Sequence, residues 1–210
     1  MEEKSNLERL QDFAKQTGRQ IFFKEEQYPL PPYRKFPRYR RTAYIPYDEE
    51  KNLFLVFFGD PYHKIMDYTI FCGAYLKINA SQNSKLNFRE KNIIDKLNPF
   101  SKGGMLKMGN RQFDSKVITT GNDSSLLNRV FKNAKLQRYM MEALQSKMFL
   151  NFSLNETNVD FVPELAGHSH LALINPQEWV LDANTLESWL RSMARIKTIL
   201  QNKEVVQAMY

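Results

Sequence analysis

The segment 109–144 constrains the fold of this chain more than any other part of the sequence. It joins a predicted strand over residues 113–119 to a polar turn, and the turn to a run of regularly spaced apolar residues. Asp123, or Asn122 beside it, has the short acceptor side chain that satisfies free N–H groups at the start of a helix. The segment therefore predicts a strand that leads into a capped amphipathic helix, and hence helices packed against a sheet.

The apolar residues after the turn fall into two sets, each with the spacing of one face of a helix. Between the sets, Lys132 and Asn133 interrupt the pattern, so we expect the helix to break there. The first set is Leu126, Leu127, Val130 and Phe131, and the second is Leu136, Tyr139, Met140, Ala143 and Leu144.

Capping signals, apolar runs and turn formers predict the other elements. Ser5 and Glu8 have the spacing of a capping box, which predicts a first helix over residues 5–17. Gly73 lies inside a predicted strand and indicates a bulge or the close approach of another backbone. Strands are expected over 53–58, 68–78, 149–154, 159–162 and 169–174, a helix over 86–98, and a last helix that begins at Asp182.

Strands cluster in the middle of the chain without a regular alternation of strand and helix. The predicted class is therefore α+β, with a mainly antiparallel sheet packed with three or four amphipathic helices. We expect residues 1–47 to form an N-terminal helix and a Pro/Arg-rich extended arm, and residues 48–210 to form a single α+β domain. Prolines between 29 and 46 argue against a continuous helix or a central strand in the arm.

Cysteine usage and hydropathy predict a location in the cytoplasm. Cys72 is the single cysteine, which excludes an intramolecular disulfide and a Cys-rich zinc site. The first residues lack the apolar region of a signal peptide, and the longest apolar run, 53–58, is too short to cross a bilayer. We expect a cytoplasmic protein that is not integral to a membrane, although it can be peripheral to the inner membrane.

Positive charge is concentrated in the arm. Residues 33–41 contain five cations and no anion, whereas the whole chain has 30 Lys and Arg against 23 Asp and Glu. The remaining 25 basic residues nearly balance the 23 acidic ones. Rings alternate with the cations, a mixture that suits phosphates and stacked bases, and also an anionic membrane surface. The residues are Arg34, Lys35, Arg38, Arg40 and Arg41, with Tyr33, Phe36 and Tyr39.

These features favour a non-enzymatic binding module over an enzyme. We expect the basic arm to dock on an anionic membrane surface or on an acidic protein partner. Nucleic acid is an alternative partner for the same arm. A solvated arm, whose rings pack on the sheet and whose charges aid solubility, is the simplest interpretation.

Two histidines motivate a third alternative, an enzyme with a site near them. On a strand, His168 and His170 would point to the same face, an arrangement that can hold a metal. The third histidine, His63, is far away in sequence, and nothing specifies further ligands. The simpler interpretation is that both histidines are polar residues in a turn that enters a strand. We therefore predict neither a metal nor a cofactor.

Other catalytic interpretations have equally simple alternatives. Asp60, His63 and Lys64 resemble an acid/base cluster, but a hairpin connection contains the same residue types. Cys72 inside a strand is expected to be an inert core residue. The sequence contains neither the surroundings of a nucleophilic serine nor a phosphate-binding glycine loop. We therefore predict no catalytic residues.

A motif in segment 109–123 resembles a large bacterial domain family of unknown function. In that family a Gly-Asp dipeptide precedes a Phe-Asp-x-x-Phe-x-Val strand, a polar turn and a helix that runs into a second one. The resemblance covers about residues 66–200 and is most specific in its first third. Here Asn110 replaces the usual Asp, and Val117 the usual Phe.

The resemblance implies a fold and supplies no catalytic site. Many members of the family have N-terminal transmembrane helices that place this domain alongside the membrane. We expect the motif residues to be structural, with Asp114 accepting backbone N–H bonds at a strand edge. They are Gly109, Phe113, Asp114, Gly121, Asn122 and Asp123.

Overall fold

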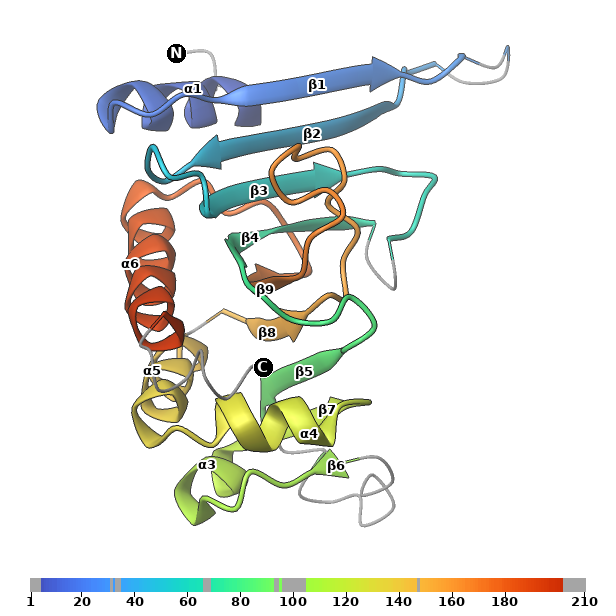
Figure 1. The fold of residues 1–210 in the computed structure, drawn as a ribbon. Coiled ribbons are helices and arrows are strands. Elements are labelled where there is room, and N and C mark those ends of the chain that lie inside the picture. The colour runs from blue at the N-terminus through green and yellow to red at the C-terminus, as the bar shows by residue number, and fades with distance from the viewer. Residues whose placement is uncertain are drawn as a thin grey trace.

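The computed structural model describes residues 5–30, 32, 35–65, 69–92, 95, 105–146 and 148–201. Within these residues, nine strands form one antiparallel sheet in the order β1-β2-β3-β4-β9-β8-β5-β7-β6 (Figure 1). Helices lie along one face of this sheet. The prediction of an α+β fold with a mainly antiparallel sheet is confirmed.

The strands are β1 (Phe22–Gln27), β2 (Tyr39–Pro46), β3 (Leu53–Gly59), β4 (Ile70–Lys77), β5 (Leu86–Glu90), β6 (Met105–Leu106), β7 (Val117–Gly121), β8 (Asn151–Leu154) and β9 (His170–Asn175). The helices are α1 (Asn6–Gln16), α3 (Arg111–Lys116), α4 (Ser124–Leu126), which continues as the π-helical segment η2 (Leu127–Phe131), α5 (Ala134–Leu144) and α6 (Ala183–Leu200).

The central strands are buried on both faces. On one face, the main core packs Leu10 of α1 and Leu190 of α6 against side chains of the sheet. On the other face, the segment between β8 and β9 crosses the sheet, and its Val162 belongs to the same buried cluster as Phe58 of β3 (Figure 1). Every residue from Leu53 to Phe58 is therefore buried, as the uninterrupted apolar run predicted.

Side-chain caps begin the helices where the sequence predicted them. Ser5 accepts a bond from the Glu8 N–H, and the Glu8 carboxylate accepts one from the Ser5 N–H. Asp123 accepts the Leu126 N–H at 2.8 Å, and Asp182 accepts the Thr185 N–H at 2.8 Å. The predicted break is also confirmed, because Asn133 caps a new helix, α5.

The prediction for the arm is wrong in part. Residues 22–27 and 39–46 are strands rather than an extended connector, and β2 lies between β1 and β3. Most of the prolines avoid the ladders because they lie in the connection between β1 and β2, and Pro46 is the last residue of β2. The prolines therefore indicate the connection between two strands, and they do not exclude strands on either side of it.

Three further predictions need correction. A capped helix, α3, occupies the first part of the predicted strand 113–119, because the Asn110 side chain accepts N–H bonds from Gln112 and Phe113. The strand β5 replaces the start of the predicted helix 86–98, of which residues 93, 94 and 96–98 lie outside the described ones. The predicted strand 159–162 is instead a turn in the segment that covers the sheet.

Candidate functional site

The predicted basic arm does not form a continuous free surface. Arg40 and Arg41 lie on β2 directly opposite Glu26 and Glu25 of β1. The Arg41 Nε is 2.5 Å from a carboxylate oxygen of Glu25, and an Arg40 Nη lies 3.6 Å from Glu26. Arg41 also lies over the ring of Tyr39, at 5.1 Å. These three arm residues therefore belong to the ladder between β1 and β2, whereas a free docking arm was expected.

The other arm residues lie at the end of the sheet. Tyr33 and Arg34 lie outside the described residues, whereas Lys35, Phe36 and Arg38 belong to the connection from β1 to β2. This connection extends beyond the sheet on the same side as the connection from β3 to β4 (Figure 1).

Aromatic contacts join the two connections. The Tyr28 ring meets the Tyr62 ring edge-on, with 4.8 Å between the ring centroids. The Arg38 guanidinium lies 5.2 Å from the centroid of the same Tyr62 ring. The described residues of 28–38 and residues 60–64 thus form one unit, which we call the two-loop tip.

Asp60 organises the base of the two-loop tip. Its side chain is 2% exposed and accepts hydrogen bonds from the Tyr28 hydroxyl at 2.8 Å, the Tyr62 N–H at 2.9 Å and the His63 N–H at 3.2 Å. The Arg40 Nε lies 3.9 Å away. The bond to Asp60 raises the pKa of the Tyr28 hydroxyl, because it stabilises the protonated phenol. Asp60 is therefore a structural acceptor in a turn, as the sequence predicted.

The outer surface of the tip combines apolar side chains with free cations. Phe36 is 79% exposed, Leu30 48% and Tyr62 48%. Lys35 and Lys64 are also exposed, and neither forms an ion pair with a described residue. Sequence reasoning missed Leu30 and Tyr62, and it considered Lys64 only as a member of an acid/base cluster with Asp60 and His63. Leu30 carried a signal, because it is an apolar residue between two prolines in a run of turn formers.

A shallow hollow adjoins the tip. Its volume is about 480 Å³, and its lining includes Arg38, Arg41 and Trp179. The indole N–H of Trp179 donates to the carbonyl oxygen of Phe58 at 2.8 Å, which fixes the ring at the edge of the hollow. The hollow thus continues the cationic surface of the tip toward β2.

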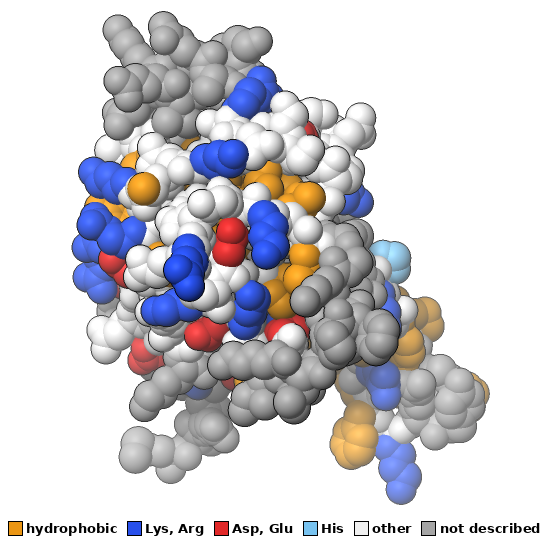
Figure 2. All heavy atoms as spheres, turned by 90° about the horizontal axis from the view of Figure 1, so that it is seen from below, with side chains coloured by type: hydrophobic (Ala, Val, Ile, Leu, Met, Phe, Trp, Pro, Cys, Tyr) orange, Lys and Arg blue, Asp and Glu red, His pale blue; other side chains and the backbone are white. Residues whose placement is uncertain are grey.

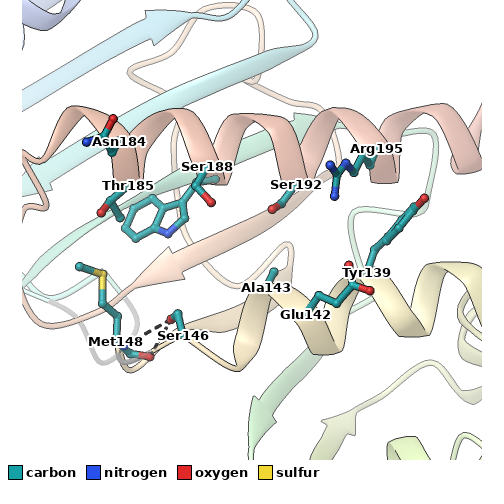
Figure 3. Close-up of a pocket in the computed structure, with 11 residues that line it drawn as sticks. Tyr139, Glu142, Ala143, Ser146, Met148, Asn184, Thr185, Ser188, Ser192 and Arg195 are labelled. Carbon is teal, nitrogen blue, oxygen red and sulfur yellow. Dashed lines mark hydrogen bonds between the residues drawn. The ribbon is translucent and has the colours of Figure 1, made fainter.

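A second hollow, of about 460 Å³, lies between α5 and α6 (Figure 3). Ser188 and Ser192 of α6 point toward Ala143 of α5, and Arg195 lies 5.8 Å from the Tyr139 ring at one end. Small side chains explain the gap between the helices. Among the described residues, none that lines it has a buried polar atom without a partner. The hollow therefore indicates imperfect helix packing rather than a built site.

The two histidines are not brought together. His170 is buried against the Tyr75 ring, whereas His168 is exposed. The only link between them is from the His170 Nδ1 to the His168 carbonyl oxygen, at 3.3 Å. Across the part of the chain that the structure describes, no three His, Cys, Asp or Glu residues lie close enough to hold a metal.

Burial lowers the pKa of His170 below its usual value of 6.5, because the charged imidazolium is poorly solvated. As the pH falls, the unfolded chain takes up this proton before the folded chain does. The contribution of His170 to stability is therefore present above about pH 6.5 and is lost as the pH falls below it.

We expect melting temperatures measured from pH 7 to pH 5 to fall more steeply in the native protein than in His170→Gln. The His168→Gln control should keep the native slope, and parallel curves for all three proteins would contradict the expectation.

The residues of the sequence motif support local structure. Asp114 accepts the N–H groups of Met108 at 2.9 Å and Gly109 at 3.1 Å, although it lies on α3 and not at a strand edge. Asn122 accepts the Lys85 N–H at 2.7 Å. Phe113 is fully buried in the main core. In this structure the motif therefore closes turns and fills the core.

Cys72 is a core residue. It is fully buried in β4, and burial raises the pKa of its thiol to about 12. Its sulfur accepts the N–H of Val180 at 3.2 Å. At neutral pH this thiol is protonated and shielded, which does not suit a nucleophile.

Comparisons of the chain with protein-family models, curated proteins and solved structures found no match. The resemblance to the bacterial family therefore stays a prediction. Within the described residues, no helix combines the length and the apolar composition that a bilayer span requires.

Proposed function

We propose that this protein is a non-enzymatic module that docks on an anionic membrane surface through the two-loop tip. The observation that supports the proposal is the exposure of Leu30 and Phe36 beside cations on two connected loops. Apolar side chains of this kind can enter the boundary between headgroups and acyl chains, while cations bind the headgroups.

The apolar part favours a membrane over single-stranded nucleic acid. Rings can stack on bases, but the aliphatic Leu30 has no π-face with which to do so. Arg40 and Arg41 also have carboxylate partners on β1, which weakens a phosphate-binding interpretation of the whole arm.

The expected affinity is modest and reversible. A cation near anionic headgroups contributes about 1 kcal/mol, so Lys35, Arg38 and Lys64 together contribute about 3 kcal/mol. Burial of an exposed ring such as Phe36 adds about 2 kcal/mol. The sum corresponds to a dissociation constant of roughly 0.1–1 mM, which suits a peripheral contact.

Liposome flotation tests the proposal. Replacing Lys35, Arg38 and Lys64 by Ala is expected to weaken binding to phosphatidylserine vesicles about 100-fold, because about 3 kcal/mol is lost. Leu30→Ser with Phe36→Ser should weaken binding to the same vesicles by a factor of at least about 10.

A matched control removes three exposed cations from the helices. Arg9, Lys15 and Arg191, each replaced by Ala, change the net charge equally and should leave flotation unchanged. Equal losses in this control and in the tip variant would contradict the proposal. An acidic protein partner would require the tip cations but not Leu30 and Phe36. Vesicle binding that survives the double serine substitution would show that the cations alone bind the headgroups, and would contradict the insertion of Leu30 and Phe36.

A further inference from the structure

Outside the arm, basic and acidic residues are nearly equal in number, but they are unevenly distributed along the chain. Residues 85–138 contain 12 Lys and Arg against 4 Asp and Glu, a net charge of +8. The whole chain has a net charge of +7, so the arm and all other residues together have a net charge of −1. The expectation that positive charge is concentrated in the arm alone is therefore wrong.

Most of the acidic side chains in this segment are engaged within the protein. Asp95 forms two short hydrogen bonds, of 2.6 and 2.7 Å, with the Arg89 guanidinium. Asp114 accepts backbone N–H groups, and Asp123 accepts the Leu126 N–H and the Ser84 hydroxyl. Among the described residues, none of these carboxylates forms an ion pair with an exposed cation of the segment, although the Leu126 N–H and, more weakly, the charge of Arg129 lower the pKa of Asp123.

Seven exposed cations of this segment form no ion pair with a described residue: Lys85, directly before β5, and six that lie on or directly beside β6, α3, η2 and α5. The Asn110 side chain donates to Gln137 at 2.6 Å and so ties the start of α3 to α5, which places their cations on adjacent elements. Viewed from this end, Lys and Arg side chains spread over the surface with fewer acidic groups between them (Figure 2). We call this surface the basic face, and its cations are Lys107, Arg111, Lys116, Arg129, Lys132 and Lys135.

The basic face differs chemically from the two-loop tip. None of the large exposed hydrophobic side chains of the described chain lies between residues 85 and 146. Among its described residues, the face therefore lacks a large exposed hydrophobic side chain that could enter a bilayer or stack on unpaired bases, and the hydrophobic patches between its cations are smaller (Figure 2). Dispersed cations without these features suit a regular array of phosphates.

We propose that the basic face binds the phosphate backbone of double-stranded nucleic acid without reading its sequence. Lys and Arg side chains neutralise successive phosphates and release the counterions condensed on the duplex. This binding is independent of the membrane contact proposed for the two-loop tip, which lies at the opposite end of the strand order.

Fluorescence anisotropy with a labelled DNA duplex of about 20 base pairs tests the proposal, at salt concentrations from about 50 to 200 mM. In the native protein the logarithm of the affinity should fall steeply with the logarithm of the salt concentration. Replacing Arg111, Lys116, Arg129 and Lys132 by Ala should reduce this slope by about 3 to 4 and weaken binding at least about 30-fold at the lowest salt.

A charge-retaining variant distinguishes electrostatic binding from damage to the fold. Exchanging Arg for Lys and Lys for Arg at the same four positions should preserve the affinity and the slope. If this variant loses binding as the alanine variant does, or if the native protein does not bind the duplex at low salt, the proposal is wrong.

A second control removes the same charge elsewhere, with Ala at Arg9, Lys15, Lys77 and Arg191. It should retain nearly all duplex binding, and an equal loss would show a net-charge effect and overturn the proposal. Flotation with phosphatidylserine vesicles separates the two surfaces. Vesicle binding lost through the basic-face variant, with duplex binding intact, would assign this face to lipid and also overturn the proposal.

Discussion

Replacing Gly73 with alanine is expected to destabilise the protein by about 3 kcal/mol. A Cβ atom at this position would lie 2.3 Å from the Leu173 carbonyl oxygen and 3.0 Å from the Ile174 Cα. Gly73 pairs with Ile174 in the ladder between β4 and β9, at the centre of the sheet. Relief of the clash requires two hydrogen-bonded strands to separate, because the obstructing atoms belong to the backbone.

Urea unfolding followed by circular dichroism measures this loss, and Gly59→Ala is the matched control. Gly59 also lies on a central strand, but its added Cβ would have Trp179 as its nearest neighbour, at 3.9 Å. We expect the Gly59 variant to change the free energy of unfolding by less than about 1 kcal/mol. Similar losses in the two variants would show that the close approach of β9 does not control stability.

Replacing Phe88 with alanine is expected to cost about 4 kcal/mol. Phe88 is fully buried on β5, and its ring centroid lies 5.0 Å from that of Phe131 on η2 and 6.5 Å from that of Phe113 on α3. The ring thus joins two helical segments to the sheet, and its removal leaves a cavity that rigid neighbours cannot fill.

Thermal and urea unfolding of a Phe88 series test this expectation. Phe88→Leu should lose clearly less than Phe88→Ala, because most of the buried volume is retained. Phe149→Ala is the exposed control, since its side chain is 73% exposed and little apolar area is lost. If the Phe88 and Phe149 alanine variants were equally stable, Phe88 would not be part of a packed core.

Local signals in the sequence correctly predicted the elements that depend on near neighbours. The Ser5 capping box, the Asp123 and Asp182 caps and the break before Asn133 involve groups within a few residues of one another. The strand 53–58 was also predicted correctly, because a short apolar run bounded by turn formers fits a strand that is covered on both faces.

Predictions failed where local patterns were ambiguous or partners were distant. The apolar residues around Phe113 fitted a strand, but the Asn110 cap selected a helix for α3. Leu86 and Phe88 of β5 point toward the core in alternation with more exposed residues. A strand of five residues is too short for this alternation to be recognised in the sequence. The pairing of β2 with β1 was hidden by the prolines of the connection between them.

For the candidate sites, too, the sequence showed the residue types, whereas contacts between distant residues decided how they are used. The sequence showed which residues of the arm are cationic or aromatic, but the strand register decided which of them are neutralised. The sequence also contained the cations of segment 85–138. Which of these cations lack an ion pair depends on the tertiary structure, because Asp95, Asp114 and Asp123 are engaged in hydrogen bonds within the protein.

The sequence by itself therefore determined the fold class, most of the caps and the positions of the charged residues, because these depend on residue type and short spacing. Only the tertiary structure decided that Tyr62 would join Arg38 in one tip, and which cations would remain free. These outcomes depend on contacts between residues that are distant along the chain. Such contacts form only when the whole sheet has assembled.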